Sequence, residues 1–126
     1  MNQVKFMKYH ESEEMYLETI LLLTTRQNEV RSIDIANELN YSRASVSRAM
    51  GLLQKKEYIV IENSFIKLTE LGMKRATDIF ERHEIITDLL VKIGVSKEMA
   101  EDNACRIEHV ISPELLVYFK KFLEKK

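Results

Sequence analysis

A thiol, a carboxylate and an imidazole lie close together near the end of the chain, in the stretch ACRIEHVIS at residues 104–112. On a helix, Cys105, Glu108 and His109 fall within about a third of the circumference, beside an apolar face. Thiolate, carboxylate and imidazole together suit a transition metal of borderline softness, because hard ions such as calcium prefer oxygen alone. Three ligands leave such a site incomplete.

Two other segments place a polar side chain where a helical hydrophobic period asks for hydrocarbon. His83 lies on the stripe that contains Ile79 and Ile86, and Glu18 follows Met15 by almost one turn. Burying Glu18 without a partner would be costly, so a metal or a cationic partner is an economical explanation. Plainer readings stay open: a hydrogen-bonded structural histidine, a glutamate that reaches solvent and a methionine that fills the core.

The chain contains one cysteine, so it cannot form an internal disulfide, and Cys105 is either a small core residue or a functional thiol. An enzyme that uses Cys105 as nucleophile and His109 as its base is one alternative. The sequence offers it no oxyanion loop, no Gly-rich turn and no third orienting group. We therefore expect a binding protein, not an enzyme, with no small organic substrate.

The elements that position these residues are expected to be mainly helical. The 126 residues suffice for one domain or two small ones that share a core, and 45% hydrophobic residues is ordinary for a soluble protein. Three glycines and one proline leave little loop punctuation. No apolar run approaches the ~20 residues that cross a bilayer, and the start lacks an apolar signal core. We expect a cytoplasmic protein without a membrane partner.

Two short helices in the first half of the chain form a helix-turn-helix pattern. Ser32 is a predicted N-cap for IDIANEL and Ser42 for RASVSRAMGLLQKK, with only a short turn around NYS between the helices. β-Prone runs at residues 58–61 and 65–67 then flank the polar ENS, and Thr69 caps the next helix. This order predicts a winged helix, whose second helix enters the major groove and whose hairpin wing lies on the phosphate backbone.

The second helix of this motif is locally basic, although the formal net charge of the chain is -1. Residues 41–56 contain four basic residues and no acidic one. Its apolar residues Val46, Met50 and Leu53 are expected to face the core. The residues expected to face double-stranded DNA are Ser42, Arg43, Ser45, Ser47, Arg48, Lys55 and Lys56. A bidentate contact of Arg48 with guanine would contribute ~1 to 3 kcal/mol of discrimination, and the other three cations suit phosphates. A solvated basic face is the plain alternative.

The remaining segments are predicted to be helical as well. The expected helices cover about residues 11–25, 69–93 and 96–111, with a break at GVS before the third, and a last helix has Ser112 as N-cap and Pro113 in its first position. We therefore predict a mainly α protein. It has a winged helix-turn-helix domain of three helices and a β-hairpin wing at residues 1–70 and a second, helical domain at residues 71–126.

Five strings resemble, in this order and spacing, the metal-dependent repressors typified by the diphtheria toxin repressor and the manganese transport regulator: SEEMYLETILLL, DIANELNYSRASVSRAM, LTELG, RHEIITDLL and ACRIEHVIS. The resemblance spans about residues 12–123. It implies that the second domain is a dimerisation and metal-binding domain and that the homodimer binds palindromic operator DNA when loaded with metal, controlling genes of metal homeostasis. Because the chain ends with the dimerisation helices, we expect a short form without the SH3-like domain of the iron branch.

The resemblance also implies two sets of metal ligands. The regulatory site of the iron-responsive branch is matched by Met15, Cys105, Glu108 and His109. Ligands of the binuclear site of the manganese branch are matched by Glu18 and His83. The manganese branch has carboxylates where this chain has Met15 and Cys105, so the softer pair favours ferrous iron, with manganese second. Zinc, cobalt or nickel would also fit such a site in vitro.

Two positions depart from the iron branch. Its ancillary site uses a carboxylate and a second histidine where this chain has Thr87 and Glu101. The sequence therefore leaves open whether an ancillary site exists and whether the main site holds one metal or two. A winged-helix regulator that ignores metals, with a structural Cys-Glu-His cluster, is the remaining alternative from the residues alone.

Overall fold

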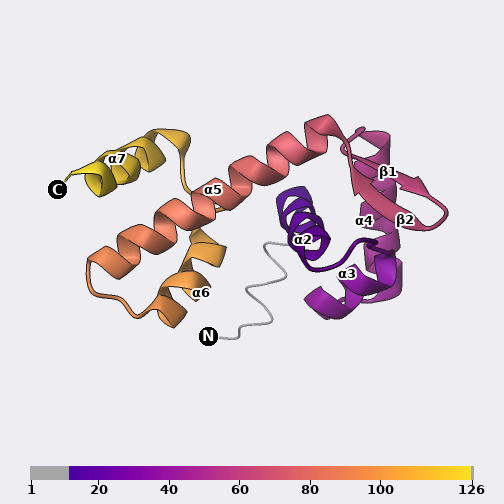
Figure 1. Ribbon diagram of the computed structural model, residues 1–126, viewed down its shortest axis with the longest axis horizontal. Helices are drawn as coiled ribbons and strands as arrows, with labels where there is room; N and C mark the ends of the chain where they lie inside the picture. The colour runs from indigo at the N-terminus through magenta and orange to yellow at the C-terminus, as the bar shows by residue number, and fades with distance from the viewer. Residues whose placement is uncertain (1–11, 126) are drawn as a thin grey trace. The chain divides into compact units, whose positions relative to one another are not determined.

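The computed structural model describes residues 12–125 of the chain, which divide into two compact units between Thr77 and Asp78. Unit 1 ends at Thr77 and unit 2 begins at Asp78. The elements of unit 1 are α2 (Glu13–Arg26), α3 (Ser32–Leu39), α4 (Arg43–Lys55), β1 (Ile59–Glu62), β2 (Phe65–Leu68) and the start of α5 (Glu70–Lys92). Unit 2 contains the rest of α5, α6 (Lys97–Ile107) and α7 (Pro113–Glu124). The predicted fold class, mainly helical with a two-stranded hairpin after a helix-turn-helix, is confirmed (Figure 1).

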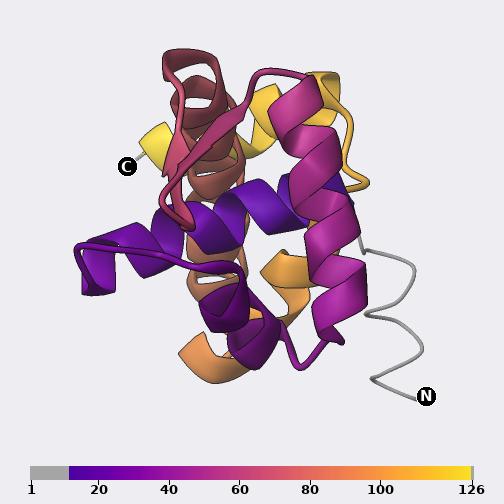
Figure 2. The same ribbon diagram turned by 90° about the vertical axis from the view of Figure 1, so that its right-hand side faces the viewer.

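Unit 1 is built around α2. This helix packs against α3, α4 and β2, and it crosses α4 in Figure 2. Leu17 and Ile20 of α2 are fully buried, as are Ile35 of α3 and Val46 of α4. Ser12 caps α2 by accepting a hydrogen bond from the backbone N–H of Met15. The expected start of this helix at residue 11 lies outside the described residues.

The wing is a short antiparallel hairpin. β1 pairs with β2 from Ile59 opposite Leu68 to Glu62 opposite Phe65. The two residues of its turn both have positive φ, 52° at Asn63 and 71° at Ser64. Such a turn matches the right-handed twist of the strands, so the polar ENS closes the hairpin tightly.

Local capping signals correctly located three helix starts. Ser42 accepts a hydrogen bond from the N–H of Ser45, Thr69 Oγ1 accepts one from the N–H of Gly72, and Ser112 caps α7. The predicted cap at Ser32 is wrong, because Ser32 is the first helical residue. Asp34 reaches back and accepts a hydrogen bond from the backbone N–H of Arg31 at 2.8 Å, which moves the start of α3 one residue earlier.

In unit 2, α6 is shorter than the expected helix over residues 96–111. It ends at Ile107, and Glu108 is its C-cap with φ -57° and ψ -27°. The predicted cluster of Cys105, Glu108 and His109 therefore does not lie on one continuous helix. No glycine or proline marks this helix end in the sequence, so the spacing of apolar residues predicted a helix that continues to residue 111.

Candidate metal centre and DNA-facing surface

The recognition helix α4 presents its predicted DNA face to solvent. Val46, Met50 and Leu53 are at most 1% exposed and fix the helix on unit 1, as expected. The residues on its other sides divide by exposure: the exposed ones are Ser42, Arg43, Ser47, Arg48, Lys55 and Lys56, and Ser45 is half-buried. The structure therefore leaves the first two turns of α4, with their hydroxyls and guanidinium groups, available to a partner.

Lys56 differs from the other predicted phosphate contacts, because its ammonium group is paired within unit 1. Its Nζ donates to Oε2 of Glu13 in the first turn of α2. Lys55, the neighbouring lysine, is exposed. No local pattern predicts this pair, since 43 positions separate the two residues.

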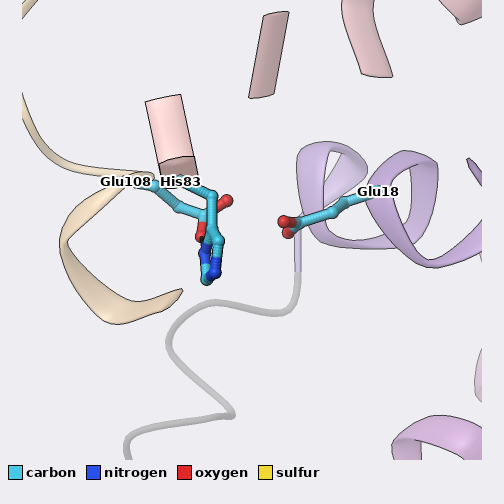
Figure 3. Close-up of side chains that lie close together, drawn as sticks. All are labelled: Glu18, His83 and Glu108. Atoms are coloured by element: carbon cyan, nitrogen blue, oxygen red, sulfur yellow. Dashed lines mark hydrogen bonds and ion pairs between the residues drawn. The ribbon is translucent and has the colours of Figure 1, made fainter. Parts of the chain in front are cut away.

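Two of the predicted metal ligands, His83 and Glu108, are brought together by the fold from α5 and the end of α6. His83 Nδ1 and Glu108 Oε1 lie 2.8 Å apart in a hydrogen bond (Figure 3). This bond raises the pKa of His83 above its ordinary value, against partial burial, which lowers it; the carboxylates of Glu101 and Glu84 add to the rise. The imidazole of His83 and the carboxylate of Glu108 are thus held side by side. His83 is the histidine that the sequence pattern placed on an apolar stripe.

Glu108 fits a cation better than it fits a purely structural role. Its side chain is 0% exposed, and its second oxygen, Oε2, has no hydrogen-bond partner among the described residues. A buried carboxylate oxygen without a partner is costly, and a bound cation would satisfy it. Thr87, at the position of the absent ancillary ligand, is also buried with an unsatisfied hydroxyl Oγ1. The imidazole of His83 and the unpartnered oxygen of Glu108 fit a divalent metal held by nitrogen and oxygen.

The two remaining predicted ligands of unit 2 are placed differently. Cys105 lies half-buried on α6 and forms no disulfide, and His109 is half-buried just beyond the end of that helix. Among the described residues, neither joins a close group of three or more histidine, cysteine or carboxylate donors. Glu108 is thus hydrogen-bonded to His83 of α5, 25 positions earlier in the chain.

The predicted ligands of unit 1 both lie on α2. Met15 is 5% exposed, and its sulfur accepts a long hydrogen bond of 3.8 Å from the hydroxyl of Tyr41. Glu18 is half-buried one turn further along. Sequence reasoning missed Tyr41, which follows α3, because no local pattern links it to a methionine 26 positions earlier.

Two family models match the chain. One, described as the N-terminal DNA binding domain of the iron dependent repressor, matches residues 8–64. The other, described as its metal binding and dimerisation domain, matches residues 69–126. The chain therefore belongs to the iron-dependent repressor family, which comprises metal-dependent transcriptional regulators. Within the described residues, no helix is long and apolar enough to cross a membrane.

Characterised and uncharacterised relatives agree with this assignment. An uncharacterized HTH-type transcriptional regulator of Methanocaldococcus jannaschii is 33% identical, over 91% of this chain and 94% of that one. The transcriptional regulator MntR of Escherichia coli O157:H7 is 34% identical over 87% of this chain and 72% of its own length. The diphtheria toxin repressor of Corynebacterium jeikeium is 32% identical over 91% of this chain, which spans only 49% of that repressor.

Solved structures show the same fold. The crystal structure of IdeR from T. acidophilum superposes with a TM-score of 0.81 at 26% identity, covering 90% of this chain and 55% of that one. The apo form of the manganese-activated repressor ScaR has a TM-score of 0.77 at 27% identity, covering 88% of this chain and 54% of that one. The chain thus spans about half the length of these structural relatives.

Proposed function

We propose that this protein is a transcriptional repressor that binds operator DNA as a homodimer when it is loaded with a divalent transition metal. The observation that carries the proposal is the His83–Glu108 pair, in which a fully buried carboxylate keeps one oxygen without a protein partner. Because both residues also match ligand positions of the family, a metal accounts for their types, their burial and their unsatisfied oxygen together.

The proposed ligands come from three places in the chain. His83 and Glu108 supply nitrogen and oxygen in unit 2, where Cys105 and His109 follow as further donors, and Met15 and Glu18 are the donors on α2. Two sulfur atoms in this set favour ferrous iron, and manganese is the second choice. When bound, the metal would supply a positive charge that satisfies these donors. The protein positions the donor side chains and shields them from solvent.

The DNA-binding half of the proposal rests on α4. Arg48 is proposed to read a guanine edge, and the serines and Arg43 in the first two turns contact bases and phosphates. A palindromic operator requires two recognition helices about one DNA turn, ~34 Å, apart. Metal binding would favour the state of the homodimer that binds this operator. Saturation at ~100 times the dissociation constant contributes ~2.7 kcal/mol to that state, which suffices for a switch.

A mobility-shift titration tests the corepressor role. The probe is a duplex selected from a random-sequence pool by the metal-loaded homodimer, and the protein is titrated with and without ferrous iron under anaerobic conditions, and with and without manganese. We expect roughly hundredfold tighter binding with metal. Equal affinity in all conditions contradicts the proposal and favours a metal-independent winged-helix regulator, which equilibrium dialysis would show to retain no metal.

Metal choice is tested by exchanging the sulfur ligands for carboxylates. The double variant Met15→Asp, Cys105→Glu is expected to move activation of DNA binding from iron towards manganese, because hard oxygen donors suit manganese better. The readout is the ranking of the two metals in the same mobility-shift assay. An unchanged ranking shows that Met15 and Cys105 do not select the metal. Zinc, cobalt and nickel are included, because they outcompete iron and manganese at many such sites in vitro.

A further inference from the structure

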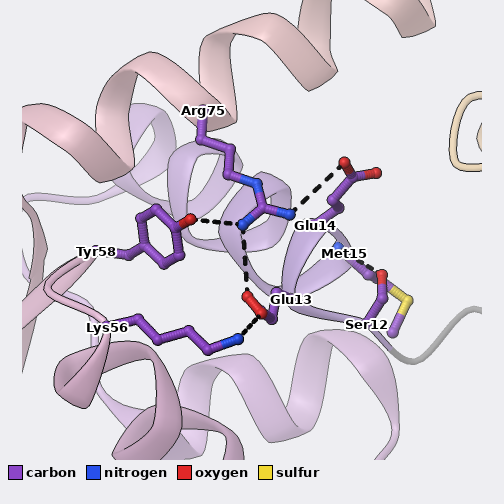
Figure 4. A network of polar contacts seen from close by, with 7 residues as sticks. All are labelled: Ser12, Glu13, Glu14, Met15, Lys56, Tyr58 and Arg75. Carbon is purple, nitrogen blue, oxygen red and sulfur yellow. Dashed lines mark hydrogen bonds and ion pairs between the residues drawn. The ribbon is translucent and has the colours of Figure 1, made fainter.

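A polar network in unit 1 ties the first turn of α2 to the end of the recognition helix (Figure 4). Glu13 lies between two cations: its Oε2 accepts from Nζ of Lys56, and its Oε1 accepts from Nη1 of Arg75 at 3.4 Å. Arg75 also donates to the hydroxyl of Tyr58 at 2.8 Å and lies 3.8 Å from a carboxylate oxygen of Glu14. One carboxylate thus joins α2, the C-cap of α4 and α5.

Glu13 is held in place more firmly than an ordinary surface carboxylate. Its side chain is 29% exposed and that of Arg75 is 34% exposed. The guanidinium group of Arg75 also stacks over the ring of Tyr58, 5.1 Å from its centre, just before the wing begins. Arg75 therefore keeps Glu13 beside α4, whereas Lys56, with 54% exposure, is the partner that is able to move.

This arrangement removes most of the advantage that Lys56 would give to DNA binding. An exposed ion pair contributes little to stability, and a single lysine contact to a phosphate likewise contributes little at moderate salt. If the ammonium group of Lys56 moved to a phosphate, it would also leave the carboxylate of Glu13 facing a polyanion. Both effects oppose a contact between Lys56 and a DNA phosphate. The Glu13–Lys56 pair therefore behaves toward DNA as a nearly neutral group.

We propose that Glu13 limits sequence-independent DNA binding, because holding Lys56 removes one phosphate contact from the recognition helix. Phosphate contacts carry no sequence information, whereas base contacts such as that proposed for Arg48 do. Suppressing a phosphate contact lowers the affinity for all DNA while base discrimination is kept. The inference rests on the proposed function, since it concerns the same recognition helix.

The test measures the salt dependence of binding to a random-sequence duplex, which needs no knowledge of the operator. The metal-loaded full chain is titrated by fluorescence anisotropy between about 50 and 200 mM salt, a range in which each phosphate contact changes the affinity ~3- to 4-fold. We expect Glu13→Gln to steepen the logarithmic salt slope by ~0.9, the effect of one added contact. Its affinity for random DNA rises at low salt.

Glu14→Gln is the matched control. It removes the same charge from the same turn of α2 and also contacts Arg75, but it does not contact Lys56 in the pair described above. We expect its salt slope to equal that of the wild type. The double variant Glu13→Gln, Lys56→Gln should return to the wild-type slope, and Lys56→Gln alone should change little, in contrast to Lys55→Gln, which lowers the slope.

Two outcomes overturn the inference. If Glu13→Gln and Glu14→Gln steepen the salt slope equally, the cause is a general charge effect. If Lys56→Gln lowers the salt slope as much as Lys55→Gln does, Lys56 already contacts a phosphate in the wild type. Thermal melting checks the fold; if Glu13→Gln melts early, the comparison of the two lysine variants decides alone. Failure of the proposed function has a different signature, in which metal changes the binding of no variant or no variant binds DNA.

Discussion

Units 1 and 2 differ in how much apolar surface each buries. In unit 1 every helix and both strands contribute buried apolar side chains, among them Leu17, Ile35, Val46, Ile59 and Ile66. In unit 2 the buried apolar residues among those described are Ile79, Ile86, Ala100 and Ala104, and α7 has none. Unit 1 therefore has the larger apolar core, whereas the described part of unit 2 buries little apolar surface of its own.

The surface of α7 indicates what unit 2 lacks. Leu115, Tyr118 and Phe122 recur at helical spacing and are 47%, 67% and 45% exposed. An apolar stripe of this kind marks an interaction surface. Because the family model that matches this region is described as a metal binding and dimerisation domain, a second copy of the chain is the partner that we propose for it. We therefore expect unit 1 to be stabilised within one chain and unit 2 to gain stability from assembly with a second copy.

The largest effect is expected where unit 1 is tightest. A Cβ at Gly72 would lie 2.0 Å from the carbonyl oxygen of Tyr58, and that oxygen also accepts hydrogen bonds from the N–H and hydroxyl of Thr69. Since backbone must move, we expect Gly72→Ala to lower the free energy of unfolding by about 3 kcal/mol. Urea denaturation of the metal-free protein measures the change.

Gly51 provides the control for this substitution. A Cβ there meets nothing within 4 Å, so Gly51→Ala is expected to raise the free energy of unfolding by up to about 1 kcal/mol through helix propensity. If Gly72→Ala lowers the free energy of unfolding by less than about 1 kcal/mol, the backbone around Gly72 moves more easily than the packing of unit 1 indicates.

The next largest effect is expected at the buried carboxylate of unit 2. Glu108→Gln keeps the shape of the side chain but removes the charge, so metal affinity should fall by about 100-fold or more. Equilibrium dialysis with manganese or zinc measures the loss, and Glu98→Gln, an exposed change on α6, is the control. Unchanged affinity would mean that Glu108 is a structural residue and that unit 2 does not need the metal to complete it.

A smaller effect concerns the surface of α7. Tyr118→Glu places a charge in the apolar stripe, so the dissociation constant of the homodimer should rise about tenfold or more. Sedimentation velocity over a dilution series measures this change. The matched change in unit 1 is Leu52→Glu, at a position that is 57% exposed, and it should leave self-association unaltered. If both variants remain equally dimeric, α7 is not the interface.

The smallest effect is the dependence of metal binding on pH. As a proposed ligand, His83 would bind metal only in its neutral form, and its pKa is raised above 6.5 by the hydrogen bond to Glu108. In the metal-free protein, the protonated pair stabilises the fold fully below about pH 6.5, and this contribution is lost as pH rises through the raised pKa. Metal affinity has the opposite sign and should fall by up to about tenfold per pH unit below that pKa. Isothermal titration across this range tests it; an onset at or below pH 6.5 contradicts the raised pKa.

The elements of the fold were predictable from the sequence because their signals are local. Ser42 caps α4 through the N–H of a residue three positions away, and the combination of Ser112 and Pro113 fixes the start of α7 in the same way. The end of α6 was misplaced by four residues, because Glu108 keeps helical angles after the helix has ended. Helix ends without glycine carry no comparable signal.

The contacts of the candidate site were not predictable in the same way. His83 and Glu108 were each selected, one from its place on an apolar stripe and the other from its neighbours, but nothing local joins residues 25 positions apart. The Glu13–Lys56 pair was not predicted for the same reason. Lys56 was expected to contact phosphate, and in the structure it is paired with Glu13. Residue types were readable from the sequence, whereas their partners depended on tertiary packing.

The lack of buried side chains on α7 makes the amount of protein in the cell a second input to the proposed switch. A unit that is completed by a second copy gains stability as its concentration rises. At low copy number a repressor of this kind would be limited by encounter between its own subunits before metal supply mattered. Gene dosage and metal level would then act on the same equilibrium, and a modest rise in expression would sensitise the cell to metal without any change in the site itself.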